Sequence, residues 1–276
     1  MVRGAGGPLM STPIQINGAT RLIGIIGDPI VQVKSPAVYS QLFAERGLNV
    51  VMIPLHVFWD SIDAVVAGLD GIANLDALIV TAPYKTHLLR MADTLGPAAA
   101  CVGAVNALKK GSDGEWHGDL FDGAGFVAGV RKKGYALSGR RVHMFGAGGA
   151  GGAIAHALAL AGVQSIRLSD PHLKRVADVC AAIGRTLPGF DIAPKGENDA
   201  PYDFVINAST VGLGGGAGLP GELGSLSSEV LVGEVNMTAA GTELVRLAQA
   251  RGCQWVDGRD MHAGQIDQLL AFLFPA

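Results

Sequence analysis

Three glycines in the middle of the chain have the spacing of a phosphate-binding turn. Gly146, Gly148 and Gly151 follow an apolar run that ends at Phe145, and an alanine-rich helical pattern continues to Ala161. In such a turn the first glycine permits the tight bend, the second lets a pyrophosphate approach the backbone, and the third lets helix and strand pack closely. Free N–H groups at the helix start then hold the phosphates. The predicted dinucleotide contacts here are Gly146, Ala147, Gly148, Gly149, Ala150 and Gly151.

An acidic residue stands where the ribose of a dinucleotide would lie. Asp170 directly follows the next predicted strand, 165–169. A carboxylate there suits the two ribose hydroxyls of NAD and would repel the extra phosphate of NADP. Asp170-Pro171 is also an ideal helix start, an N-cap followed by proline, and that role needs no cofactor. The two roles are compatible, so the sequence favours NAD, with NADP as the less favoured cofactor.

Composition excludes several classes of function. The 276 residues carry a formal net charge of -3, which gives no reason to expect a nucleic-acid partner. Cys101, Cys180 and Cys253 lack C-x-x-C spacing and suit free thiols in a reducing compartment. The seven histidines do not fall in ligand spacing with cysteines or acids, so no metal site is expected.

One apolar stretch resembles a membrane span. Residues 142–166 contain no Asp, Glu, Lys or Arg, but the six glycines within them separate a strand pattern from a helix pattern. The first 13 residues lack the apolar core of a signal peptide. We therefore expect a soluble, cytoplasmic protein with no membrane partner, either a monomer or a homodimer.

Strand and helix patterns alternate along the chain, which predicts βαβ units on parallel sheets. The expected fold is α/β and two-lobed, with the lobes meeting near 120–125 and a C-terminal helix, from about 263 to 274, packing back onto the first lobe. The expected strands are 21–26, 50–54, 77–81, 104–108, 116–118, 141–145, 165–169, 204–207, 230–235 and 253–256. The expected helices, besides the last, are 35–46, 61–69, one from near 86, 124–133, the alanine-rich run to 161, 171–183 and 242–250.

Ordered motifs along nearly the whole chain resemble the shikimate/quinate dehydrogenase family. They include 16–20, 24–29, Lys34-Ser35-Pro36, 80–85, 103–106, Gly118-Asp119, Asp122-Gly123, the glycine turn, 206–208, Thr242, Gly258 and 261–265. The resemblance implies an N-terminal substrate domain, 18–122, joined by the C-terminal helix, 263–276, and a Rossmann-like NAD(P)-binding domain, 123–262. It also implies reversible hydride transfer between a nicotinamide cofactor and a secondary alcohol of a hydroxylated cyclic carboxylate, the chemistry of shikimate, 3-dehydroshikimate and quinate in aromatic amino acid biosynthesis.

The family's catalytic pair is a lysine and an aspartate, here Lys85 and Asp122. Oxidising an alcohol requires a proton acceptor within hydrogen-bond reach of the hydroxyl, and the sequence does not show which of the two takes the proton. Outside the motifs, Lys85 would read as a solvated lysine and Asp122 as a helix N-cap. The resemblance further implies substrate contacts at Ser35, Thr81, Asn106 and Gln265, and cofactor contacts at Asn207, Ala208 and Gly258. Ser35 followed by Pro36 also fits a helix N-cap.

The chain departs from the family at the substrate side. Polar residues of the family are replaced by Val33, Ile79, Leu120, Phe121 and Met237, and Gln32 stands where histidine is common. A buried substrate hydroxyl facing an apolar side chain would lose about 1–3 kcal/mol. We therefore expect catalysis to persist with a preferred substrate that is either shikimate-like or less polar. The alternative is a non-catalytic NAD-binding regulatory protein that kept the fold. On the cofactor side, the family's Asn-Arg-Thr is Ser169-Asp170-Pro171, which again favours NAD.

Overall fold

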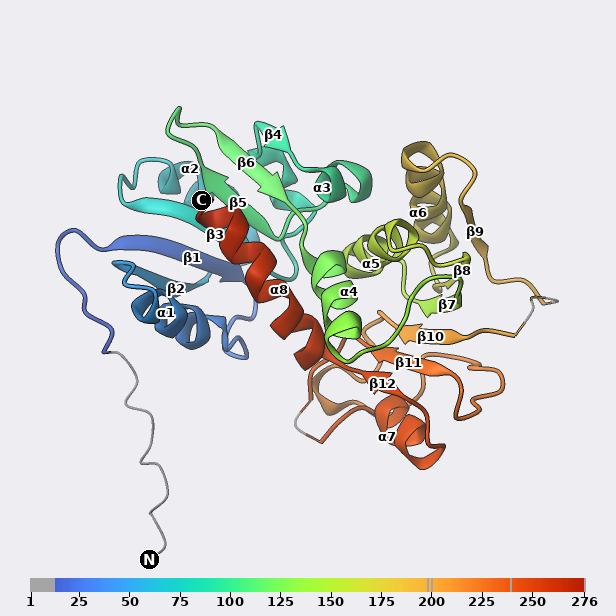
Figure 1. The fold of residues 1–276 in the computed structure, drawn as a ribbon. Helices are drawn as coiled ribbons and strands as arrows, with labels where there is room; N and C mark the ends of the chain where they lie inside the picture. Colours follow the sequence, from blue (N-terminus) through green and yellow to red (C-terminus); the bar gives the residue numbers. More distant parts are fainter. Residues whose placement is uncertain (1–12, 198, 200, 239, 276) are drawn as a thin grey trace, which may run out of the picture. The chain divides into compact units, whose positions relative to one another are not determined.

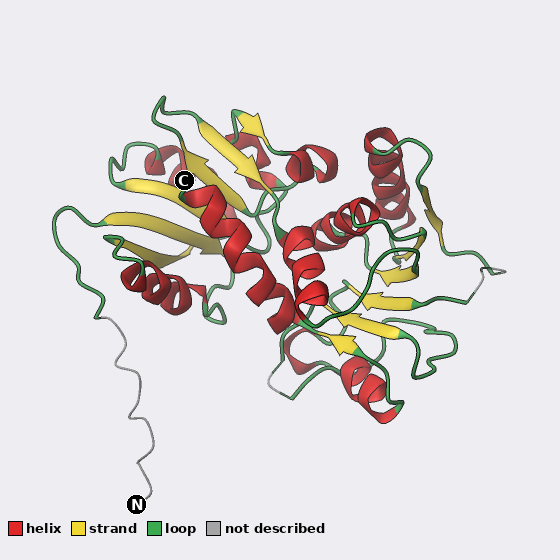
Figure 2. Ribbon diagram, viewed as in Figure 1, coloured by secondary structure: helices red, strands yellow, loops and turns green. Residues whose placement is uncertain are grey.

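The computed structural model describes residues 13–197, 199, 201–238 and 240–275. The chain forms two compact units, each a sheet with helices packed on it (Figures 1 and 2). The first unit contains residues up to Thr94 together with Asn106–Gly118. The second contains Leu95–Val105 and the residues from Asp119 onward. The predicted α/β class is confirmed.

The first unit is organised on β1 (Arg21–Gly27), which pairs in parallel with β2 (Val50–His56) and β3 (Leu75–Val80). The middle of β1 is a continuous buried run, as expected for a strand with neighbours on both sides and covered faces. The helical elements are α1 (Ser35–Glu45), α2 (Ile62–Leu69) and the 3₁₀ turns η1 (Trp59–Ser61) and η2 (His87–Met91). The helix expected from near residue 86 is therefore only the short η2.

The rest of the first sheet departs from the parallel pattern. Strand β5 (Ala107–Lys110) pairs with β3 in the antiparallel sense. Beyond it lie β6 (Trp116–Asp119) and the two-residue β4 (Thr94–Leu95), which gives the order β2-β1-β3-β5-β6-β4. Strands β5 and β6 follow each other closely in sequence and are neighbours in the sheet, whose edges are β2 and β4.

The second unit has a six-stranded sheet in the order β12-β11-β10-β7-β8-β9, and every adjacent pair is parallel. The chain runs outward from β7 on one side and from β10 on the other, so the strand order reverses between them. Ligands of open α/β sheets bind at the carboxyl ends of the strands beside such a reversal. The strands are β7 (Arg141–Phe145), β8 (Ser165–Ser169), β9 (Asp191–Pro194), β10 (Phe204–Asn207), β11 (Leu231–Glu234) and β12 (Trp255–Val256).

Helices cover both faces of this second sheet. Val142 and Met144 pack with α5 (Gly149–Leu160) and α6 (Leu173–Thr186) in one buried cluster. Phe145 and Val205 pack with α7 (Glu243–Ala250) in another. Because successive side chains of a strand point to opposite faces, β7 contributes to both clusters. The 3₁₀ turn η3 (Leu213–Gly215) lies in the connection between β10 and β11.

Helices α4 (Asp122–Lys132) and α8 (Gly258–Leu273) pack at very short range within the second unit (Figure 1). A Cβ on Gly264 would lie 2.2 Å from the Gly125 carbonyl oxygen, and one on Gly129 would lie 2.6 Å from the Asp260 oxygen. Helix α8 begins five residues before the predicted 263 because Asp257 and Asp260 form a reciprocal capping box. Helix α3 (Pro97–Val102) also belongs to this unit.

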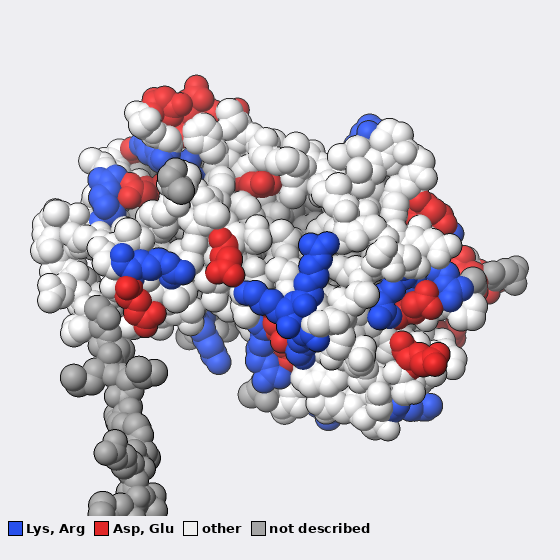
Figure 3. Space-filling model, in the orientation of Figure 1, with Lys and Arg blue, Asp and Glu red and all other residues white. Residues whose placement is uncertain are grey.

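The compact units differ from the predicted domain boundaries, because residues 95–105 and helix α8 pack with the second unit. The assignment of substrate and cofactor binding to the two stretches stays a prediction. Among the described residues, no helix has both the length and the hydropathy that crossing a bilayer requires. On the face shown in Figure 3, several Lys and Arg side chains lie close together near the centre of the view, and a group of acidic side chains lies at its upper edge.

Candidate active site

The glycine turn follows β7 at the reversal of strand order. Gly146 has φ +97°, and a Cβ on it would lie 2.6 Å from the Ala208 carbonyl. A Cβ on Gly151 would lie 2.1 Å from the Gly146 oxygen, so helix α5 packs directly on the turn. By contrast, a Cβ on Gly148 would meet no described atom within 4 Å. The first and third glycines therefore shape the turn, while Gly148 leaves its outer side open to a ligand.

The side chain of Asp170 forms a hydrogen bond with the backbone of the glycine turn. Its Oδ2 accepts the Ala147 N–H at 2.9 Å, and its Oδ1 accepts the His172 N–H at 2.8 Å. Helix α6 starts only at Leu173 with His172 at the N-cap position, so the predicted N-cap role of Asp170 is wrong. Both oxygens instead accept backbone hydrogen bonds, which partly compensate the negative charge of the carboxylate.

A buried carboxylate organises the loops after β10 and β11. Glu234 is fully buried and accepts hydrogen bonds from Asn207 Nδ2 at 2.9 and 3.1 Å, the Asn236 N–H at 2.9 Å, and Thr242 Oγ1 at 2.8 Å. Burial raises the pKa of Glu234, and these hydrogen bonds oppose the rise. These bonds fix the side chain of Asn207, which is one of the predicted cofactor contacts. The next predicted cofactor contact, Ala208, donates its N–H to the Phe145 carbonyl at 2.7 Å.

Replacing Glu234 with leucine should lower the thermal stability sharply. The change leaves donors of Asn207, Asn236 and Thr242 buried without their acceptor, which we expect to cost at least about 3 kcal/mol in free energy of unfolding. Thermal denaturation of the full chain measures it. The exposed Glu229, replaced in the same way, is the matched control and should change the Tm little. Equal Tm values for the two variants would show that the network contributes nothing to stability.

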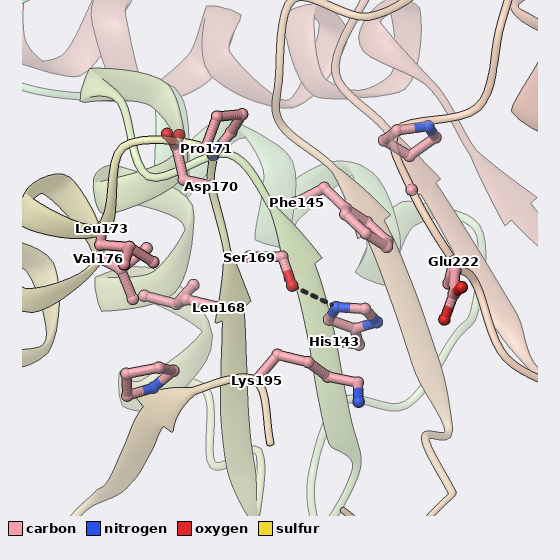
Figure 4. Close-up of a pocket in the computed structure, with 13 residues that line it drawn as sticks. His143, Phe145, Leu168, Ser169, Asp170, Pro171, Leu173, Val176, Lys195 and Glu222 are labelled. Atoms are coloured by element: carbon pink, nitrogen blue, oxygen red, sulfur yellow. Dashed lines mark hydrogen bonds between the residues drawn. The ribbon is translucent and has the colours of Figure 1, made fainter. Parts of the chain in front are cut away.

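A pocket of about 430 Å³ opens beside Asp170, between the carboxyl ends of β7, β8 and β9 and the segment Pro220–Glu222 (Figure 4). Its lining includes His143, Phe145, Ser169 and Lys195. Burial lowers the pKa of His143 to about 4, so its imidazole is neutral at pH 7. Sequence reasoning missed this pocket, because a lone histidine within an apolar strand reads as a core residue.

Predicted substrate contacts of the first unit lie around the carboxyl end of β3. Thr81 follows that strand, is half-buried, and donates its N–H to the Ile26 carbonyl at 3.0 Å. Asn106 is buried, and its backbone oxygen accepts the Val80 N–H at 2.8 Å. Lys85 is half-buried in the turn before η2. The structure therefore brings the segments of Thr81 and Asn106 together at one strand end.

Ser35 is the first residue of α1, and the N-cap position belongs to Lys34, without a side-chain capping bond. The predicted capping role of Ser35 is therefore wrong. Ser35 is half-buried, and the substrate contact that the resemblance implies for it stays a prediction.

The apolar replacements differ in burial. Ile79 and Leu120 are buried at 8 % and 1 % exposure, whereas Met237 is 53 % exposed. Val33 is half-buried, and the Phe121 ring packs against Phe272 at 5.1 Å between centroids. Ile79 and Leu120 thus serve the core of their units, which explains their apolar character without reference to a substrate.

Asp122 and Gln265 are adjacent in the second unit. Asp122 is 6 % exposed and is the first residue of α4, with Phe121 at the N-cap position, so it is not itself the N-cap. Gln265 Nε2, from α8, donates to Asp122 Oδ1 at 3.4 Å. Gly258 begins α8, and a Cβ there would lie 2.4 Å from the Val235 carbonyl oxygen. Lys85, the other member of the predicted catalytic pair, belongs to the first unit.

Curated relatives align with nearly the full chain. The protein named shikimate dehydrogenase (NADP(+)) from Rubrobacter xylanophilus is 34% identical over 256 residues, which cover 91% of this chain and 89% of the relative. Other relatives at 31–32% identity have the same name. These names contradict the predicted preference for NAD. That prediction took Asp170 as a free carboxylate facing the ribose, whereas backbone N–H groups occupy both of its oxygens.

A family model described as the shikimate dehydrogenase substrate binding domain matches residues 25–108. Shikimate 5-dehydrogenase from Listeria monocytogenes, solved with shikimate and NAD, is 28% identical with a TM-score of 0.84, covering 94% of this chain and 93% of that one. The 5-ketofructose reductase of a Gluconobacter strain is also 28% identical, with a TM-score of 0.81 and coverage of 93% and 94%. From its identity to the curated relatives and the shared fold, this chain belongs to the shikimate/quinate dehydrogenase family of oxidoreductases.

Proposed function

We propose that this chain catalyses reversible hydride transfer between a nicotinamide dinucleotide and a hydroxylated ring carboxylate, interconverting 3-dehydroshikimate and shikimate or their quinate counterparts. The observation that carries the proposal is the glycine turn, with Gly148 open and helix α5 starting at the next residue. These N–H groups and the helix dipole fit a pyrophosphate. The curated relatives support the same reaction class.

The chemistry assigns separate tasks to the two units. The nicotinamide supplies or accepts the hydride when bound. Lys85 donates a proton to the carbonyl oxygen of the substrate during reduction and accepts it during oxidation. The carboxylate of Asp122, positioned by Gln265, orients the substrate hydroxyl and Lys85. Ser35, Thr81 and Asn106 bind the carboxylate and ring hydroxyls, so residues 18–122 form the substrate domain and residues 123–262 the cofactor domain.

We assign NADP(H) as the cofactor because the curated relatives carry it in their names. Three positive side chains are the candidates for contact with the 2′-phosphate. Lys195 lines the same pocket as Asp170, and Lys174 and Arg175 stand in the first turn of α6. The helix start adds a favourable dipole for the anion.

Initial rates with 3-dehydroshikimate test the proposal. Loss of absorbance from NADPH should depend on substrate, and kcat/KM with NADPH should exceed that with NADH. Binding of NADPH without turnover of any ring ketone would overturn the enzyme assignment and favour a regulatory dinucleotide-binding protein.

A less polar substrate is the second candidate, favoured by Val33 and Phe121, which are only half-buried and so can reach a ligand. Oxidation rates with shikimate, quinate and cyclic hydroxy acids that lack ring hydroxyls decide between the two. Each unpaired buried hydroxyl should lower kcat/KM by about tenfold or more. Higher kcat/KM with shikimate than with every simpler acid would exclude this candidate.

A further inference from the structure

Two residues that flank Lys85 in the sequence both place an aromatic ring against Trp59. The Trp59 and Tyr84 rings are stacked, with 5.5 Å between their centroids and an interplanar angle of 14°. The His87 ring lies 5.1 Å from the indole in a tilted arrangement. Tyr84 directly precedes Lys85, and His87 is the first residue of η2. One indole in η1 therefore contacts the chain before and after Lys85, within the first unit.

Tyr84 and His87 each have a second contact with the same stretch of chain, residues 57–63. Tyr84 is fully buried and donates its hydroxyl to the Val57 carbonyl at 2.5 Å. His87 Nε2 and Asp63 Oδ1 are 2.7 Å apart. The stretch that carries the indole thus fixes both aromatic residues through polar contacts as well as through ring packing.

Lys85 needs such support because it lies in a turn between β3 and η2 and not within a helix or strand. A functional side chain in a turn keeps its place only when neighbouring side chains are locked by packing and hydrogen bonds. A misplacement of about 1 Å can lower a catalysed rate by about 10²-fold. The position of the Lys85 ammonium therefore depends on contacts that its neighbours make.

Trp59 is unusually exposed for a residue with this packing. It is 52 % exposed, and within the described part of the chain both aromatic rings that contact it flank Lys85. The adjacent Phe58 is also an exposed aromatic residue, but its ring contacts His56 at 5.2 Å between centroids. Two neighbouring exposed aromatic residues thus have different ring partners, which makes Phe58 a matched control.

We propose that Trp59 is a positioning residue for Lys85. Its indole holds Tyr84 and His87 in place, and these two residues fix the turn so that the Lys85 ammonium reaches the substrate oxygen. This role of Trp59 rests on the proposed function, in which Lys85 transfers the proton. Loss of the indole should therefore lower kcat and leave the affinities for substrate and cofactor nearly unchanged.

Steady-state kinetics of full-chain variants with 3-dehydroshikimate and NADPH test the proposal. Trp59→Ala should lower kcat about tenfold or more, while KM for the ring ketone stays within about threefold. Trp59→Phe, which keeps a flat ring, should recover most of the lost kcat. Trp59→Leu keeps apolar volume without a flat ring and repeats the test in case Trp59→Ala does not fold. Phe58→Ala should keep kcat within about twofold.

A double variant shows whether Trp59 acts through Lys85. Effects of residues that act as a unit are not additive, so Trp59→Ala combined with Lys85→Met should have the same kcat as Lys85→Met alone. A further loss in the double variant as large as the loss in Trp59→Ala alone would show that the indole acts independently of the lysine, and would overturn the proposal.

The other outcomes separate this role from the reaction itself. A kcat within about twofold of wild type in Trp59→Ala or Trp59→Leu would overturn the positioning role and leave the proposed reaction intact. An equal loss of kcat in Phe58→Ala would do the same, because it would show general damage to this stretch. No turnover by the wild-type chain, or full turnover by Lys85→Met, would overturn the proposed function and the role of Trp59 with it.

Discussion

Replacing Lys85 with methionine is expected to lower kcat about 10²–10⁴-fold while cofactor affinity stays within about twofold. Methionine keeps the length and apolar stem of the side chain but removes the ammonium that transfers the proton. Cofactor binding should persist because the glycine turn belongs to the other compact unit. Steady-state kinetics with saturating ring ketone and NADPH, together with direct titration of NADPH, measure the two effects separately.

Lys132→Met is the control for this experiment. Lys132 pairs with Asp267 at 3.1 Å, and both side chains are more than half exposed, so the pair contributes little to stability. This variant should keep kcat nearly unchanged. If Lys85→Met retains more than about a tenth of the wild-type kcat, Lys85 is not the proton-transfer group.

Replacing Gly148 with alanine should weaken dinucleotide binding by at least about tenfold and leave the Tm unchanged. Gly148 has φ -79°, which alanine adopts without strain, and the new Cβ would meet no described protein atom within 4 Å. The methyl group would instead occupy the space through which a pyrophosphate approaches the backbone. Titration with NADPH and a thermal melt test both parts.

Alanine substitutions at two other glycines are the controls for this experiment. Gly151→Ala places a Cβ 2.1 Å from the Gly146 oxygen and should destabilise the fold itself. Gly184→Ala lies in helix α6 without a close neighbour and should stabilise the chain by about 0.5–1 kcal/mol without affecting binding. Unchanged NADPH affinity in Gly148→Ala would show that the dinucleotide does not bind on this turn.

Much of the fold could be predicted because long local patterns specify it. The apolar run of β1, the alanine-rich α5 and the glycine turn each contain their signal within about ten residues. Strand β9 has no such pattern, because it is a short edge strand with exposed ends and a proline. The antiparallel pairing of β5 with β3 could not be predicted from the sequence either, because strand direction depends on partners distant in the sequence.

The candidate site could be predicted only where a motif identifies a residue. Asp170 lies at the position where an acid that binds the ribose is expected. The inference of NAD from this one residue gave the wrong cofactor preference. What decides its role is the pair of N–H groups of Ala147 and His172, which depend on the folded turn. His143 carries no motif. Its place in the pocket beside Asp170 became apparent only when the strand and Ser169 were placed together.

Transfer of deuterium tests the central claim most directly. The full chain is incubated with 3-dehydroshikimate and NADPH deuterated at C4 of the nicotinamide, on each face in turn, and the product is analysed by mass spectrometry. We predict that one of the two deuterated forms of NADPH transfers its deuterium to the carbinol carbon of shikimate. Unlabelled product from both cofactors, or no product at all, would contradict hydride transfer to this ring ketone.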